Sequence, residues 1–419
     1  MIGTSGYADV IGSIKEIAGE FHGFEEVMFG YRRGDGYTKH PDYNVLENRF
    51  QLKLRSFPEH PSILHEYNAV FNFKGDFTID GYYDGKTDFD LRELNLTVSP
   101  SDKWDMKLGR QILTWGTGEL LFINEVFPKD YVSFFTGRSL EYLKAPVWAL
   151  KTSYFGEHFW LDTVVMPYFE PNITPSGDRL SFYDVLRRQY SGRDSDWFLH
   201  EVPHQAENIQ YALRLYHQEG SLEWALYGYR GFYLSPVAFE NPLNAEFYYP
   251  RLDVYGGSLR GPFLNGIGNI EIGYYDSRED TSGTNRLIPN SSVKAMAGYS
   301  RDFSGDVSLG FQYFCERILQ YHEYQRNLMP GDLVSDEFRH LLTFSFTKQF
   351  RNQTVTWDNF IYFSPSDEDG YVRMSLSRTF ADKLTLTLGA NYFFGNDDYT
   401  EFGQFEGNSN VYTRARYIF

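Results

Sequence analysis

The chain has 419 residues, a formal net charge of -17 at pH 7 and one cysteine, Cys315. Nucleic acid requires a basic footprint, so this acidic balance argues against a nucleic-acid partner, and a lone cysteine excludes a disulfide framework and a cysteine-based zinc cluster. No apolar run reaches the length of a transmembrane helix, and the CxxCH, P-loop, GxSxG and HExxH motifs are absent. We therefore expect no cofactor, no metal and no enzymatic activity.

Residues 1–19 come first and show no basic-then-apolar segment, so we expect no signal peptide in this chain. From residue 20 to residue 419, segments of about ten residues alternate between apolar and polar side chains. A period of two predicts β-strands, whose successive side chains point to opposite faces. In the segment 49–55, RFQLKLR, Phe50, Leu52 and Leu54 share one face. We count about 18 strands, within a range of 16–18, and no long helical pattern.

The connections between these segments alternate between short turns, such as 217–221 and 379–383, and long polar loops, of which 116–146 and 168–206 are the longest. A sheet that closes on itself, with short turns at one rim and long loops at the other, has this rhythm. The polar faces are fully polar, unlike the inner faces of a soluble sandwich. Aromatic residues at strand ends fit the girdles of a membrane barrel, namely Tyr31, Tyr229, Tyr274, Tyr299, Phe363, Tyr392 and Tyr417. The predicted fold is all-β, a transmembrane antiparallel up-and-down barrel.

The chain ends on the alternating segment NVYTRARYIF. On a strand, Val411, Tyr417 and Phe419 share one face, whereas Arg414 and Arg416 lie on the other. Lipid does not tolerate open sheet edges, because every backbone polar group needs a partner. We therefore expect the last strand to pair with the first, within residues 20–32, and Phe419 to face lipid.

The whole chain resembles the Gram-negative outer-membrane porins. Its segment GRQILTWG, residues 109–116, resembles a GRQ-x3-WG motif of a porin-like family of unknown function and, more distantly, alginate-export-type barrels. A final Phe419 with Tyr417 two residues earlier is similar to the signal that such barrels present to the barrel-assembly machinery. The resemblance implies an integral protein of the cell outer membrane, in contact with lipid and lipopolysaccharide, with short turns and residues 1–19 on the periplasmic side and long loops outside the cell.

The segment 117–146 is the third long loop, and it is too apolar to lie fully in water, with Leu120, Phe122, Ile123 and Phe134 among its side chains. In general porins the third loop folds inward and narrows the pore, so the resemblance implies an inward constriction loop here. An outward lid, packed on other loops or on a neighbour, is the alternative. We favour the inward position.

Cations gather on strands that become neighbours when the barrel closes, and they predict a basic wall in the lumen. Strict alternation would turn Arg110 toward lipid, where a charge is costly, so we expect a bulge at Gly109 that turns it inward. Acidic groups on the third loop are expected to face the wall and to create a transverse field; simple pairing of arginines with acids is the alternative. The predicted pore-lining cations are Arg49, Lys53, Arg55, Lys107, Arg110, Arg373, Arg414 and Arg416, and the predicted constriction-loop acids are Glu119, Glu125 and Asp130.

Three functions fit the sequence in decreasing order. The first is a channel for passive diffusion of small polar or anionic solutes. The second is a scaffold or export barrel whose lumen holds an electron-transfer or export partner, and the third is an outer-membrane enzyme. An inward third loop favours the first function, whereas an unobstructed lumen favours the second. The transported solute and the choice between a monomer, a homo-oligomer and a complex with a periplasmic partner stay open.

Overall fold

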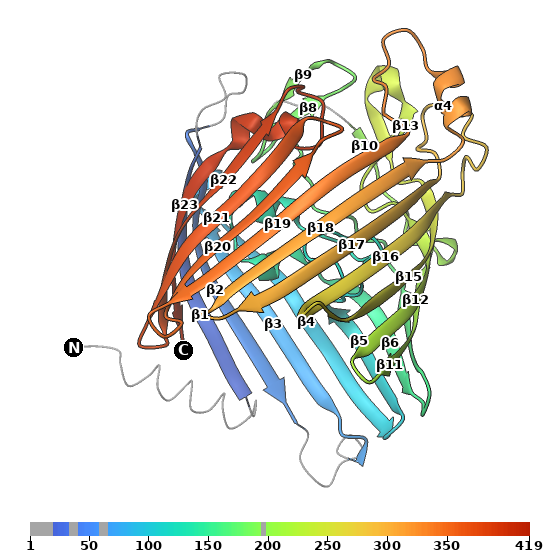
Figure 1. Ribbon diagram of the computed structural model, residues 1–419. Coiled ribbons are helices and arrows are strands. Elements are labelled where there is room, and N and C mark those ends of the chain that lie inside the picture. Colours follow the sequence, from blue (N-terminus) through green and yellow to red (C-terminus); the bar gives the residue numbers. More distant parts are fainter. Residues whose placement is uncertain (1–19, 33–40, 58–65, 194–197) are drawn as a thin grey trace.

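The computed structural model describes residues 20–32, 41–57, 66–193 and 198–419, so the expected periplasmic segment 1–19 lies outside the described residues. Eighteen strands form one antiparallel sheet that closes into a barrel (Figure 1). This confirms the predicted fold. The barrel strands are β1 (Glu20–Arg32), β2 (Tyr43–Ser56), β3 (Val70–Asp80), β4 (Lys86–Ser101), β5 (Trp104–Gln111), β6 (Val147–Phe155), β7 (Trp160–Met166), β11 (Gln210–Glu219), β12 (Leu222–Phe232), β15 (Arg251–Phe263), β16 (Gly266–Ser277), β17 (Ser292–Phe303), β18 (Val307–Ile318), β19 (Phe338–Phe350), β20 (Val355–Ser364), β21 (Asp369–Phe380), β22 (Leu384–Gly395) and β23 (Asn410–Ile418).

The first and last strands close the barrel, as predicted. β1 and β23 are antiparallel, with Phe24 opposite Ile418 and Arg32 opposite Asn410. The closure continues to the chain end, because the backbone N–H of Phe419 donates to the carbonyl of Gly23. The pairing along this seam is therefore continuous from Gly23 to Arg32, as a barrel in lipid requires.

Short and long connections lie at opposite rims. The hairpins β17–β18, β19–β20 and β21–β22 turn at the same rim as the C-terminus (Figure 1). The opposite rim carries the long loops with their small elements, which are β8 (Phe182–Asp184), β9 (Gln189–Ser191), β10 (Phe198–His200), β13 (Ala238–Asn241), β14 (Glu246–Tyr248), helix α4 (Tyr321–Asn327) and the 3-10 turns η1 (Gly81–Tyr83), η3 (Ala206–Asn208), η4 (Pro242–Asn244) and η5 (Gly403–Asn408). No helix in the described ranges is long and apolar enough to cross a membrane.

The apolar face of the sheet is the exposed one. In β1, Val27, Phe29 and Tyr31 are 50%, 44% and 52% exposed, whereas Met28 between them is 1% exposed. A protein that folds in water buries such a face, so this arrangement identifies the outer surface as the one that meets lipid. Of the predicted girdle residues, Tyr229 is an exception: it is 4% exposed and donates to Gln210 on the inner face.

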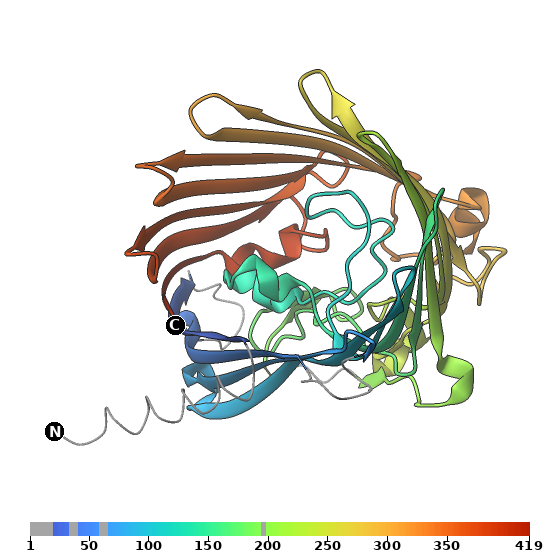
Figure 2. The same cartoon turned by 90° about the horizontal axis from the view of Figure 1, so that it is seen from below.

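The protein core lies inside the barrel. The segment 112–146 leaves β5, crosses the interior and returns to the wall at β6 (Figure 2). It carries helix α3 (Tyr131–Thr136) and the 3-10 turn η2 (Leu140–Leu143). Its apolar side chains pack against the inner faces of β17–β22 and against η5. The apolar side chains of this segment are therefore buried inside the barrel.

Candidate functional site

The segment 109–116 turns the chain from the wall into the lumen. Gly109 has φ +125, and a Cβ there would lie 2.2 Å from the carbonyl oxygen of Leu94. The side-chain amide of Gln111, which is fully buried, donates to the carbonyl of Ala149 at 2.9 Å. Trp115 packs edge to face against Phe127, with ring centroids 5.0 Å apart. These residues fix the direction in which the third loop enters the barrel.

Helix α3 has a cap at each end. The Asp130 carboxylate accepts from the backbone N–H of Ser133 at 2.7 Å and from its hydroxyl at 2.5 Å, and Gly137 ends the helix with φ +90. A short side-chain acceptor before the helix and a left-handed glycine after it satisfy orphan backbone groups. Burial raises the pKa of Asp130 above its usual value, against the opposing effect of Arg138. Asp130 therefore acts as a structural cap.

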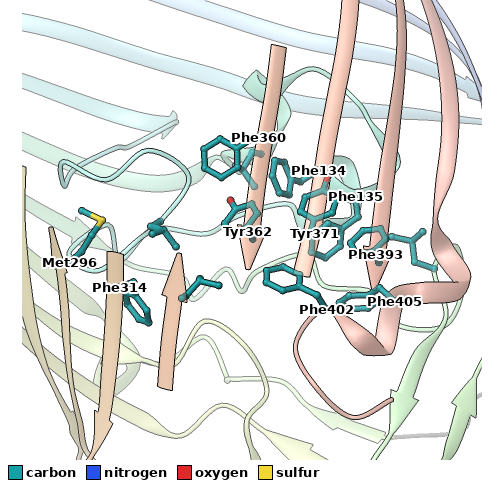
Figure 3. Close-up of a cluster of buried hydrophobic side chains, with 14 of the residues drawn as sticks. Phe134, Phe135, Met296, Phe314, Phe360, Tyr362, Tyr371, Phe393, Phe402 and Phe405 are labelled. Carbon is teal, nitrogen blue, oxygen red and sulfur yellow. The ribbon is translucent and has the colours of Figure 1, made fainter. Parts of the chain in front are cut away.

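Aromatic rings hold α3 against the wall (Figure 3). Phe135 meets Tyr371 of β21, Phe393 of β22 and Phe405 of η5, with centroid distances of 5.5, 5.2 and 5.1 Å. Phe134 meets Tyr371 at 5.5 Å. The pairs with Tyr371 and Phe393 are edge to face, a geometry that adds to the burial of their area, so α3 is fixed to one side of the barrel.

The turn η2 docks through Tyr142 on strands β2 and β3. Its hydroxyl donates to Asp76 of β3 at 2.6 Å and accepts from Gln51 of β2 at 3.1 Å. The guanidinium groups of Arg49 and Arg92 lie over its ring, at 4.3 and 4.9 Å from the centroid. Arg92 also donates to the carbonyls of residues 141 and 144. The wall cations thus bind the loop itself.

Glu141 lies between two further cations of the wall. Its carboxylate accepts from Lys74 at 3.1 Å and from Arg416 at 2.9 Å. Burial acts to raise the pKa of Glu141, but the charges of Lys74 and Arg416 outweigh it and the pKa lies below the usual 4.5.

Arg373, on β21, donates to the carbonyls of Phe134 and Arg138, both at 2.7 Å.

The predicted wall cations differ in their surroundings. Arg49 is 5% exposed and pairs with Glu47 at 2.8 Å and with Asp76 at 2.7 Å, so its charge is neutralised locally. Arg414 lies 4.0 Å from Glu26, and its Nε and Nη1 atoms have no hydrogen-bond partner within the described part of the chain. Lys53 and Arg55 are exposed, and Arg55 is only loosely paired, 3.8 Å from Glu20.

Lys107 and Arg110 occupy β5. Lys107 lies 3.8 Å from Glu93 of β4, and Arg110 binds Glu170 at 2.7 Å. The side chain of Arg110 shares a cavity with Arg49, as the inward prediction required, but the expected bulge at Gly109 is absent. The pairing of β5 with β4 and β6 runs through that glycine unbroken, and its positive φ turns the chain instead. The bulge lies in β4, where Arg92 is skipped in the pairing with β3.

The three predicted loop acids do not face the basic wall as expected. Glu119 accepts from the hydroxyl of Ser345 on β19, across the lumen. Glu125 pairs with Lys129 at 3.1 Å and with Lys144 at 3.5 Å, both within the loop. Asp130 caps α3. Partners within the loop satisfy Glu125 and Asp130, and Glu119 reaches a different strand, so within the described residues none of the three binds a predicted wall cation.

The acids that do meet the wall come mostly from the strands. Arg416 binds Glu26 of β1 at 2.8 Å, and Arg138 of the loop binds Glu47 of β2. Strand alternation places Glu47 on the same face as Arg49, and Asp76 on the same face as Lys74. The pattern could therefore have found them.

A charged cavity of about 560 Å³ lies between the loop and the β2–β5 wall. Cations and acids line it together, among them Arg49, Arg92, Arg110, Glu47, Asp80 and Glu170. No group of three or more His, Cys, Asp or Glu side chains in the described ranges has the arrangement of a metal site. The site is therefore a polar cavity lined by paired charges.

The closed barrel with an inner loop defines a porin-type fold, and comparison with solved structures agrees. No protein-family model and no curated protein matches the chain. Pseudomonas aeruginosa OccK2 (OpdF), solved in complex with glucuronate, is similar over 95% of this chain and 97% of its own, with a TM-score of 0.57 and 11% identity. Acinetobacter baumannii OccAB1 covers 95% of both chains with a TM-score of 0.54 and 12% identity, and OccAB3 of the same species covers 95% and 98% with 0.56 and 8%. The chain has the fold of these Occ/OprD-type outer-membrane porins, and the resemblance carried by residues 109–116 stays a prediction.

Proposed function

We propose that this chain is a channel for passive diffusion of small polar or anionic solutes across the outer membrane of a Gram-negative bacterium. The observation that carries the proposal is the anchoring of residues 117–146 inside the closed barrel, by aromatic packing on β22, by an ion pair with β23 and by a hydrogen bond to β3. An internal loop held against the wall narrows the lumen and leaves charged space beside it.

The anchored loop favours a channel over a scaffold or export barrel. A partner protein that filled the lumen would need the space that α3 and η2 occupy (Figure 2). The loop would have to leave both its aromatic and its ionic contacts to make room. OccK2, which shares the fold, was solved with glucuronate, a small anion, and this supports a small-solute substrate for the proposed channel.

The anion preference rests on cations that keep their charge exposed. Lys53 faces the lumen, because its strand neighbour Gln51 reaches Tyr142 of the loop and side chains two apart share a face. It has no ion pair or hydrogen bond within the described ranges. Arg55 follows on the same face. Charges in a narrow lumen are screened less than at an open surface, so these two set a local positive field despite the net charge of -17.

Planar-bilayer recordings test this function. The wild-type protein should conduct, and its reversal potential in a salt gradient should show modest anion selectivity that weakens as ionic strength rises. The double variant Lys53→Gln, Arg55→Gln should shift the reversal potential toward cations. Arg49 is unsuitable for this test, because its removal takes the ion-pair partner from buried Asp76 and leaves buried Glu47 with Arg138 alone.

The control removes two cations outside the lumen, Arg317→Gln with Arg326→Gln, whose side chains are 54% and 71% exposed. Its reversal potential should equal that of the wild type. A folded barrel without conductance would favour the scaffold function. Conductance with an unchanged reversal potential in the Lys53, Arg55 variant would remove the proposed anion preference and leave the channel.

A further inference from the structure

Three strands end on the same short pattern at the short-turn rim. The segments RDF (301–303), KQF (348–350) and RTF (378–380) close β17, β19 and β21, each with a cation followed two residues later by phenylalanine. In each segment the cation lies over the phenyl ring, at 4.8, 5.3 and 4.5 Å from its centroid. Residues two apart on a strand share a face, so each pair forms one unit on one surface.

That surface is the lipid-facing one. Lys348 is the register partner of Trp357 on β20, and Arg378 is the register partner of Leu386 on β22. Both partners are 44% exposed on the outside of the barrel. Arg301 lies opposite Leu309 of β18 in the same way. The three cations therefore point outward, side by side on alternate strands, at the membrane boundary.

Two of these cations lack a protein counter-charge. The guanidinium groups of Arg301 and Arg378 have no hydrogen bond or ion pair within the described ranges, whereas Lys348 donates to the carbonyl of Gly305. Among the acids of this rim, Asp302 accepts from Ser308 and Asp306 from Gln353, and Glu25 on β1 accepts from Asn48. An outward cation at the membrane boundary is stabilised by an anionic headgroup.

An apolar groove of about 1150 Å³ runs from Lys348 and Arg378 across the outer face of β22 and β23 to β1. The pairing of β22, β23 and β1 explains the shape of this groove. Thr413 lies between Leu388 and Phe29, and the next outward row has the small Ala415 in the same place. Short side chains between longer ones leave a trough in the wall of the barrel.

We propose that this surface binds a glycerophospholipid with an anionic headgroup, its phosphate between Lys348 and Arg378 and an acyl chain in the groove, with Arg301 adding to the positive field at the same boundary. The proposal rests on the proposed membrane location but not on channel activity. Charge complementarity favours a lipid over a second copy of the chain, because a symmetric contact between two such surfaces would bring the same cations together.

Native mass spectrometry of the detergent-purified protein tests the proposal, with phosphatidylglycerol and phosphatidylcholine of identical acyl chains as probes. Each cation near a headgroup strengthens binding roughly fivefold, so three correspond to about 100-fold. The wild type should retain phosphatidylglycerol at least about tenfold better than phosphatidylcholine at low salt. The triple variant Arg301→Gln, Lys348→Gln, Arg378→Gln should retain both lipids equally. A matched triple variant at the opposite rim, Arg230→Gln, Arg317→Gln, Arg326→Gln, should behave as the wild type.

A second variant keeps the cations and fills the groove. Thr413→Phe should weaken retention of both lipids while the headgroup preference persists. Equal retention of the two lipids by the wild type, or undiminished phosphatidylglycerol retention by the first triple variant, would overturn the proposal. So would an oligomer that the triple variant abolishes, since it would assign the surface to a second copy. Conductance is read separately and should be unchanged in the triple variant, which distinguishes a failure of this proposal from a failure of the channel.

Discussion

At the scale of single residues, Gly137 decides whether the third loop fits against its wall. It adopts φ +90 after α3, and a Cβ at this position would lie 2.3 Å from the ring of Tyr412 on β23. Gly220 in the β11–β12 turn has φ +61 with nothing within 4 Å of a Cβ. We expect Gly220→Ala to cost about 1–2 kcal/mol for the left-handed backbone alone. Gly137→Ala should cost about 2–4 kcal/mol, because overpacking adds to the same backbone term. Guanidinium chloride unfolding midpoints in detergent compare the two, and equal shifts would show that Tyr412 moves aside freely.

At the scale of elements, the turn η2 (Leu140–Leu143) is held by charges, and its docking should depend on pH. The docked pKa of Glu141 lies below 4.5, because Lys74 and Arg416 outweigh the effect of burial. Because the pKa of Glu141 is lower when η2 is docked, the ion pairs stabilise docking fully at pH values above the undocked pKa. This stabilisation is lost as the pH falls through the docked pKa. A nitroxide label at Leu140, which is half exposed, should be immobile at pH 7 and become mobile in acid. The label should be mobile at both pH values in Glu141→Gln, and a label that stays immobile in acid would assign the docking to Tyr142 and the aromatic contacts.

At the scale of the whole molecule, the barrel closes through its last residue. The ring of Phe419 stacks on Phe50 of β2 at 5.5 Å and meets Phe21 of β1 at 6.0 Å, so one side chain touches two strands beside the seam. We propose that Phe419, with Tyr417, is the signal for barrel assembly. Deletion of Phe419 should lower the yield of folded protein in the membrane fraction far more than deletion of Glu201, an exposed loop residue. Heat-modifiable migration in gels measures folding, and equal yields of the two deletions would refute the proposal.

The sequence by itself determined the barrel. A strand pattern is local, since alternation needs only the residue two positions away, and it predicted the strand number, the rhythm of turns and loops and the pairing of residues 20–32 with the chain end. The excess of apolar side chains in residues 117–146 also indicated burial, and the structure places that loop inside the barrel (Figure 2). Its role as a constriction stays a prediction.

Only the tertiary structure decided which charges meet. The loop meets the wall where Arg138 binds Glu47, Tyr142 binds Asp76 and Glu141 binds Lys74, and each of these contacts joins residues more than fifty positions apart in the chain. The expected loop acids found other partners, Glu119 on β19 and Glu125 within the loop. The turn of the backbone at Gly109 and the bulge at Arg92 likewise follow from the pairing of neighbouring strands. Alternation gives the face on which a side chain lies, but the partner across the lumen is set by how the closed barrel and its loop pack in three dimensions.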